Sequence, residues 1–200
     1  MPTARDSLLE AAEAALSARP WPAVKMTEVA GAAGVSRQTL YNEFGGKAGL
    51  GRALVRRAAD RYLDGVDRAL AQGIGPGPGE AAGRLAALAE WTVRAARARP
   101  LVRALLTGSW SPVLPAPPPP GSRQALTPGD LVRAVRDRAG AALGAEPAWR
   151  CELAVRLALS YAVAAGHEPG PEELLRLLEA ALAVPAAAPV SGRSRRAGAR

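Results

Sequence analysis

The sequence predicts an all-α protein of about nine helices, and three observations support this fold class. Apolar residues recur at helical spacing, aromatic residues make up only 4% of the chain, and Gly and Pro gather in a few short breaks. We expect an N-terminal module at 1–46, a connecting helix at 47–72 and a larger helical domain at 73–184. Residues 185–200 are rich in Ala, Pro, Gly and Arg, so a disordered basic tail is expected there.

The first expected element is a helix over about residues 7–18. Ser7 and Glu10 match an S-x-x-E capping box, and Leu and Ala residues at helical spacing follow them. Arg5 precedes this helix, where it could either reach a phosphate or the minor groove, or lie in solvent. The Arg-Pro-Trp-Pro turn that follows is rigid, and Trp21 is expected to pack between this helix and the next ones.

Residues 27–50, TEVAGAAGVSRQTLYNEFGGKAGL, are the most informative stretch of the chain. They are typical of two short helices joined by a tight turn and followed by the start of a third. Gly34 supplies the left-handed residue that a sharp bend between helices needs. Ser36 is a good N-cap for the second helix, which is expected over 37–44.

The second of these helices is expected to have two chemically different faces. Leu40 and Phe44 lie one turn apart on an apolar face that can dock on the body of the protein. The other face, within an arc of about 140°, holds Arg37, Gln38, Tyr41 and Asn42. A cation, two amides and a phenol without any carboxylate form a residue set suited to reading base edges and phosphates. This face therefore predicts a DNA-binding helix.

Ten residues of this stretch stand at fixed spacing: Ala30, Gly34, Val35, Ser36, Thr39, Leu40, Tyr41, Phe44, Lys47 and Leu50. In this register the segment resembles the helix-turn-helix signature of the tetracycline-repressor (TetR/AcrR) family, A-x-x-x-G-V-S-x-x-T-L-Y-x-x-F-x-x-K-x-x-L. The motif covers about the first quarter of the chain, and the remainder matches the family only in length and helical pattern. Two positions depart from the family. Lys25 replaces the usual Thr or Ser cap, and Gly46 replaces the usual Ser, Asn or Asp.

Combined with the polar helix face, the resemblance implies a DNA-binding surface around the motif. Its expected members are Lys25, Thr27, Ser36, Arg37, Gln38, Thr39, Tyr41, Asn42 and Lys47. Lys47 stands in the first turn of the connecting helix, where free N–H groups and the helix dipole attract a phosphate. The partner implied is double-stranded DNA with a palindromic operator, and the function implied is that of a homodimeric repressor.

Charge agrees with a nucleic-acid partner but does not by itself establish one. The formal net charge is +8. Residues 1–60 hold eight Lys and Arg against six Asp and Glu, whereas residues 185–200 hold four Arg and no acid. Half of the surplus therefore lies in the tail. The arginines and aspartates of the connecting helix are expected to form a solvated, ion-paired face.

Beyond the connecting helix, Gly and Pro mark the expected boundaries between elements. The Gly-Pro-Gly run at 73–79 is the expected domain boundary. Helices are expected at about 80–99, 101–107, 127–143, 146–166 and 171–184. Between the second and third of these, WSPVLPAPPPPG cannot form a regular helix or a central strand. It predicts an extended, polyproline-like loop with freedom to move.

The last two helices, 149–184, are expected to mediate assembly. Their apolar residues cover more than one stripe, which exceeds what a single internal face requires. The surplus fits a two-fold, four-helix contact between two copies of the chain, of the kind that the family uses. The alternative is that both helices are central to one core.

An effector pocket is implied by the resemblance alone. It would be lined by Leu88, Trp91, Leu106, Trp110, Val132, Val135 and Tyr161, each of which is equally explicable as a core residue. The scarcity of polar candidates favours a small apolar or aromatic effector. The alternative is a DNA-binding protein without a small-molecule effector, such as an activator, an architectural protein or a regulator controlled by a protein partner.

Enzymatic, metal-binding and membrane functions are not expected. The single cysteine, Cys151, lies in an apolar pattern, and the single histidine, His167, has no second soft ligand nearby in the sequence. No nucleophile–base set or phosphate-binding Gly loop is present, so no cofactor is expected. Without a signal pattern or a long uncharged apolar run, the protein is expected to be soluble and cytoplasmic.

Overall fold

The computed structural model describes residues 3–72, 80–119, 121–122, 125–144, 148–163 and 170–182. Its helices are α1 (Ala4–Ala18), the 3-10 helix η1 (Trp21–Ala23), α2 (Met26–Ala32), α3 (Arg37–Phe44), α4 (Lys47–Ala71), α5 (Glu80–Ala98), α6 (Pro100–Thr107), α7 (Pro128–Leu143), α8 (Ala148–Val163) and α9 (Pro171–Leu182). No strand occurs within these ranges, so the predicted all-α class is confirmed. The expected boundary at 73–79, the tail at 185–200 and His167 lie outside the described residues.

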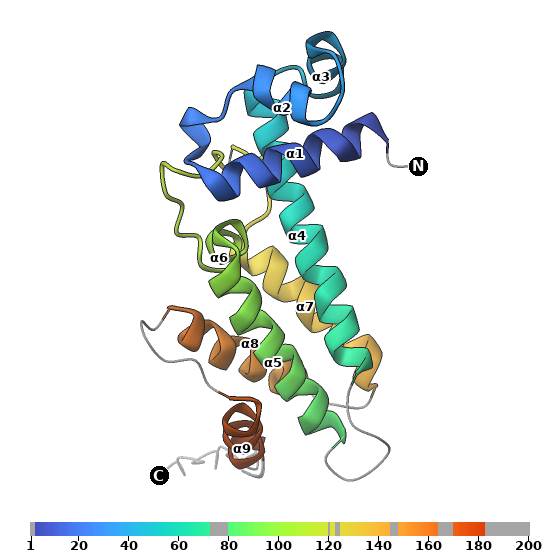
Figure 1. Ribbon diagram of the computed structural model, residues 1–200. Helices are drawn as coiled ribbons and strands as arrows, with labels where there is room; N and C mark the ends of the chain where they lie inside the picture. Colours follow the sequence, from blue (N-terminus) through green and yellow to red (C-terminus); the bar gives the residue numbers. More distant parts are fainter. Residues whose placement is uncertain are drawn as a thin grey trace, which may run out of the picture.

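The helix α4 joins the two parts of the molecule. The helices α1, α2 and α3 gather at one end of it, α5, α6 and α7 pack along the rest, and α8 and α9 pack on α5 (Figure 1). Its apolar side is buried over its whole length, from Leu50 through Leu54 and Val66 to Leu70. Because α4 contacts α1 and α3 as well as α5, α6 and α7, a shift of α4 would move the N-terminal helices with it.

The start of α1 differs from the sequence prediction. The helix begins at Ala4, and its capping box is formed by Thr3 and Asp6 instead of Ser7 and Glu10. The Thr3 hydroxyl accepts from the Asp6 amide at 3.1 Å, and the Asp6 carboxylate accepts from the Thr3 amide at 3.3 Å. Both segments fit a capping pattern, and the earlier start adds hydrogen-bonded residues to the helix. The hydrogen bonds from Thr3 hold the pKa of the Asp6 carboxyl below its ordinary value.

The turn between α2 and α3 follows the sequence prediction closely. Gly34 has a φ of 68°, and Gly45, which ends α3, has a φ of 69°, both in the left-handed region that favours glycine. Ser36 caps α3 by accepting a hydrogen bond from the Thr39 amide at 3.0 Å. At the two positions that depart from the family signature, neither Lys25 before α2 nor Gly46 before α4 makes a side-chain capping bond.

A close contact fixes α5 against α4. A Cβ atom on Gly65 would lie 2.0 Å from the Trp91 ring, so only glycine admits the indole there. The Trp91 Nε1 donates to the Tyr62 carbonyl at 3.1 Å. The side chain of the same Tyr62 is also engaged. Its buried hydroxyl shares a 3.0 Å hydrogen bond with the hydroxyl of Thr92, which also donates to the Leu88 carbonyl. Buried polar groups in this contact are therefore satisfied.

Over its described residues 110–119 the proline-rich loop forms no helix or strand, as predicted, and it packs on the N-terminal module. The Trp21 amide donates to the Val113 carbonyl at 2.8 Å. Pro115 is buried, and a Cβ atom on Gly51 of α4 would lie 3.1 Å from it. Trp21 is buried beside the same glycine. The described part of the loop, which we expected to be free, is thus attached to the N-terminal module through main-chain and proline contacts.

Among the residues with a described structure, no helix combines the length and the apolar character needed to cross a membrane.

Candidate nucleic-acid interface

The outer face of α3 carries the polar side chains that the sequence singled out. Arg37, Gln38, Tyr41 and Asn42 are all exposed, and Tyr41 is 40% exposed. Within the described chain, Arg37 makes no hydrogen bond or ion pair, so its guanidinium is available to a ligand. The Gln38 Nε2 donates to the Asn42 Oδ1 at 2.8 Å, which aligns the two amides along the helix. Each amide keeps hydrogen-bonding capacity for a base edge.

The inner face of α3 anchors the helix. Leu40 and Phe44 are buried in the core, as the helical spacing predicts. At the first turn, the hydroxyls of Ser36 and Thr39 share a 2.9 Å hydrogen bond in addition to the cap described above. Ser36 and Thr39 therefore organise the start of α3, which places Arg37 and Gln38 at the exposed N-terminal end of the helix.

Three further residues of the predicted surface lie on the flanking helices. Lys25 is exposed just before α2 and lies 3.8 Å from Glu28, while Thr27 is exposed in the first turn of α2. Lys47 begins α4, where its Nζ donates to the Pro22 carbonyl at 2.8 Å and lies 5.5 Å from the Trp21 ring centroid. An ammonium has three donors, so Lys47 keeps capacity for a phosphate while it ties α4 to the 3-10 turn.

A contact that the sequence left open connects α1 to the end of α3. The Arg5 Nη1 donates to the Glu43 carbonyl at 3.2 Å, and its guanidinium carbon lies 4.6 Å from the Phe44 ring centroid. Arg5 therefore braces the C-terminal end of α3 and is not a free arm in this structure. No local pattern around Arg5 indicates this role, because its partners lie about 40 residues away in the chain.

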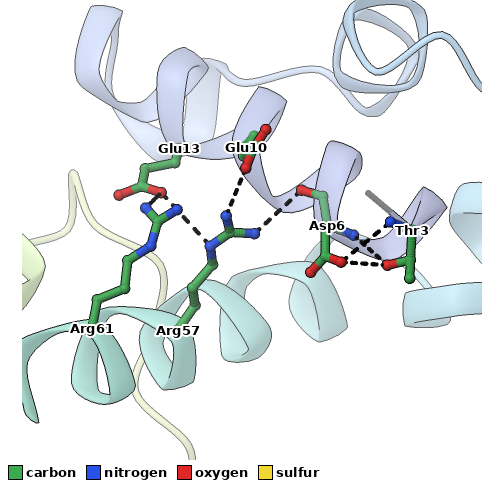
Figure 2. Close-up of polar contacts among 6 residues, drawn as sticks. All are labelled: Thr3, Asp6, Glu10, Glu13, Arg57 and Arg61. Carbon is green, nitrogen blue, oxygen red and sulfur yellow. Dashed lines mark hydrogen bonds and ion pairs between the residues drawn. The ribbon is translucent and has the colours of Figure 1, made fainter. Parts of the chain in front are cut away.

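Two arginines of α4 hold α1 in place through charged contacts (Figure 2). Arg57 donates to the Asp6 carbonyl at 3.2 Å and to Glu10 at 3.1 Å, and Arg61 forms an ion pair with Glu13. We call these residues, Asp6, Glu10, Glu13, Arg57 and Arg61, the α1–α4 clasp. The sequence predicted that the charges of α4 form a solvated, ion-paired face. For Arg57 and Arg61 this was incomplete, because their partners lie on another helix.

The seven residues of the predicted effector pocket fall into two groups. Leu88, Leu106 and Val135 are buried in the core, and Trp91, Trp110, Val132 and Tyr161 are partly buried against it. The indole of Trp91 is engaged with α4, and the Tyr161 hydroxyl donates to Glu173 at 3.4 Å. Their role as an effector pocket stays a prediction.

The described part of the chain contains no group of three or more His, Cys, Asp or Glu side chains arranged to hold a metal ion. Cys151 is buried, in agreement with its apolar sequence pattern.

Comparisons with known proteins point to one family. Residues 8–54 match the model for bacterial regulatory proteins of the tetR family. The HTH-type transcriptional regulator AlkX of Mycobacterium tuberculosis (strain ATCC 25618 / H37Rv) is 46% identical over 71 residues, which are 36% of this chain and 34% of AlkX. The match therefore spans about a third of that curated relative's length.

Solved structures resemble the fold over most of the chain. A tetR-family transcriptional regulator from Streptomyces coelicolor matches with a TM-score of 0.57 at 24% identity, covering 90% of this chain and 80% of that one. A crystal structure from Mesorhizobium loti MAFF303099, also assigned to the tetR family, gives a TM-score of 0.53 at 17% identity, covering 90% and 93%. At these identities the likeness concerns the fold alone.

The fold and the exposed face of α3 thus define a helical protein with an N-terminal helix-turn-helix module. Over residues 8–54, that module matches the tetR family of bacterial regulatory proteins. The resemblance that the sequence motif predicted is confirmed.

Proposed function

We propose that this protein is a sequence-specific DNA-binding transcriptional regulator, acting as a homodimeric repressor on a palindromic operator. The observation that carries the proposal is the outer face of α3. Arg37, which has no partner among the described residues, stands beside the hydrogen-bonded pair of Gln38 and Asn42, on a helix whose opposite face is buried. A helix of this kind fits the major groove, with its N-terminal residues at the base edges.

Each side chain of this face has a role that its chemistry suits. Arg37 would bind a guanine through its O6 and N7 atoms, and Gln38 or Asn42 would bind an adenine through its N6 and N7 atoms. Tyr41 would donate to a phosphate, as would Lys25, Thr27 and Lys47 on the flanking helices. Phosphate contacts set the register of the helix in the groove, and base contacts choose the sequence.

Assembly through α8 and α9 is supported by their surface. Trp149, Val163 and Leu177 are large apolar side chains that are 43%, 56% and 40% exposed, and all three lie on these two helices. Burying them against a second copy would remove apolar area from water. A dimer would also place two α3 helices on two half-sites, which gives the contacts that one short helix cannot.

Repression would be relieved by a small apolar or aromatic effector that prefers a conformation with a different spacing of the two α3 helices. Such a ligand weakens DNA binding only by its differential affinity for the two conformations. The helix α4 would carry the shift, because it packs against both the N-terminal helices and the helical domain.

A regulator without a small-molecule effector is the second candidate. Leu88, Leu106 and Val135 are at most 2% exposed and belong to the core, which fits a packed domain as well as a ligand-binding one. A thermal-shift screen with apolar compounds separates the two, since a true effector raises the melting temperature saturably.

The deciding experiment is a selection of DNA fragments from the source genome with the wild type, Arg37→Ala and Arg133→Ala. Arg133 is an exposed arginine of α7, far from α3 in the sequence, and serves as the matched control. A palindrome recovered by the wild type and the control but lost in Arg37→Ala would support the proposal. Unselective recovery that falls only with salt concentration would refute it.

A further inference from the structure

A cavity of about 520 Å³ lies where the N-terminal module meets the helical domain. Its walls come from the end of α1, the turn before η1, the middle of α4, the α5–α6 junction and the proline-rich loop. None of the seven residues predicted to line an effector pocket takes part in it. Its volume falls within the range of about 300–1,000 Å³ that is usual for small-molecule sites.

The lining of this junction cavity combines apolar walls with a positively charged rim. Leu16, Ala58, Leu101 and Leu114 contribute apolar surface, each from a different element. The charged lining residues are Arg19, Arg61, Arg99 and Glu13, and because Glu28 pairs with Arg19 and Glu13 with Arg61, the positive charge in excess is that of Arg99. A neutral apolar molecule would leave that excess unbalanced, whereas an anion would neutralise it.

Arg99 is the side chain most available to an anion. Within the described residues it has no ion pair, and its guanidinium lies 5.8 Å from the Trp91 ring centroid. Arg19 and Arg61, by contrast, are engaged with Glu28 and Glu13. We propose that the junction cavity binds a small organic anion, with its apolar body between Leu16, Ala58 and Leu101 and its charged group at Arg99 and Arg61.

Binding at this place would act on the α1–α4 clasp. The anion competes with Glu13 for Arg61, and Glu13 belongs to α1 (Figure 2). Losing that pair weakens the attachment of α1, while the ligand joins surfaces of both parts of the molecule. The expected consequence is a lower affinity for the operator. This consequence rests on the proposed function, but the binding site itself does not.

A fluorescent probe tests the site without any DNA. 8-Anilinonaphthalene-1-sulfonate has an apolar body and one anionic group, and N-phenyl-1-naphthylamine is its neutral counterpart. Both would be titrated into the full-length wild type, Arg99→Gln and Arg61→Gln, with Arg103→Gln as the control. Arg103 is exposed on α6, near Arg99, and does not line the cavity.

The expected result is a loss of about tenfold in sulfonate affinity for Arg99→Gln and Arg61→Gln, because each loses a charge-assisted hydrogen bond. Affinity for the neutral probe should be unchanged in both variants, and Arg103→Gln should match the wild type with both probes. Ala58→Leu, which fills the cavity without removing a charge, should lower the affinity for both probes. Circular dichroism would verify that each variant is folded. Equal sulfonate affinity in the wild type, Arg99→Gln and Ala58→Leu would overturn the site.

The link to DNA is tested on the operator recovered in the selection. Saturating sulfonate probe should lower operator affinity in the wild type and have little effect in Arg99→Gln. Saturable binding without any change in operator affinity would overturn the regulatory role. If the protein binds no DNA selectively but the probe results hold, the proposed function fails and the anion site stands.

Discussion

Arg57 of α4 donates a hydrogen bond to the carboxylate of Glu10 on α1 at 3.1 Å, and a second one to the Asp6 carbonyl at 3.2 Å (Figure 2). Its side chain is only 16% exposed, although it carries a charge. The N-terminal helix is therefore held on the connecting helix by directional polar contacts in addition to its buried leucines. Any movement of α4 near Arg57 has to move α1 with it or break these hydrogen bonds.

Replacing Arg57 with methionine should lower the free energy of unfolding by about 1–3 kcal/mol, because two hydrogen bonds of a partly buried guanidinium are lost. Urea denaturation measures this. A double-mutant cycle with Glu10→Gln should give a coupling energy of about 0.5–1 kcal/mol. Arg56→Met is the control: Arg56 is 63% exposed and pairs with Asp60 on its own helix. If both variants lose the same stability, the clasp does not hold α1.

Arg37→Ala should reduce affinity for the operator by about 1–3 kcal/mol and relax base preference at one position of each half-site. The reason is that Arg37 has no intramolecular partner in the described chain, so its loss affects only the bound state. Gln38→Ala should behave similarly at a different position, with the added loss of its bond to Asn42. Fluorescence anisotropy on operator and random DNA measures both. An equal loss on the two DNAs would contradict base reading by Arg37.

Lys47→Ala should weaken binding to all DNA sequences by a similar factor and reduce the slope of log affinity against log salt by about one. The ammonium stands at the N-terminal end of α4, where a phosphate is favoured. Because it also donates to the Pro22 carbonyl, a small loss of stability is expected as well. Titrations at several salt concentrations measure the slope. A slope equal to that of the wild type would assign Lys47 to structure alone.

Gly65→Ala should destabilise the protein by about 1–3 kcal/mol through overpacking. The new methyl group would overlap the Trp91 ring, whose Nε1 is hydrogen-bonded to the main chain of α4 and cannot move away freely. Gly83→Ala on α5 is the control, since a Cβ atom there has nothing within 4 Å. Thermal unfolding of both variants tests this contact. A lower melting temperature for Gly83→Ala than for Gly65→Ala would contradict it.

Tyr62 should make stability fall at high pH. Burial raises its pKa from 10.0 to about 12, so the folded state keeps the phenol proton after the unfolded state has lost it. The resulting stability is complete below pH 10 and is lost as the pH rises from about 10 to about 12. Tyr62→Phe should therefore show a shallower decline over this interval than the wild type, measured by urea denaturation. Parallel declines would mean that other groups cause it.

The helix α3 was predictable from the sequence because its limits depend on neighbouring residues. Ser36 caps α3 through Thr39, three residues away, and Gly34 and Gly45 supply the left-handed conformations at the turns. Leu40 and Phe44 are one helical turn apart, so local periodicity alone assigns them to the core. The start of α1 was predicted wrongly, because two adjacent segments, Thr3–Asp6 and Ser7–Glu10, satisfy the capping pattern and the structure uses only the first.

Only the tertiary structure decided how the two parts of the molecule are joined. Arg57 and Glu10 are 47 residues apart in the chain, Trp91 and Tyr62 are 29 apart, and the junction cavity draws its walls from five separate segments. Nothing local distinguishes Arg57 from Arg56, since each could pair along its own helix or reach another. The packing of α1 on α4 selects the partner, because it brings the carboxylate of Glu10 within reach of one guanidinium and leaves the next in water.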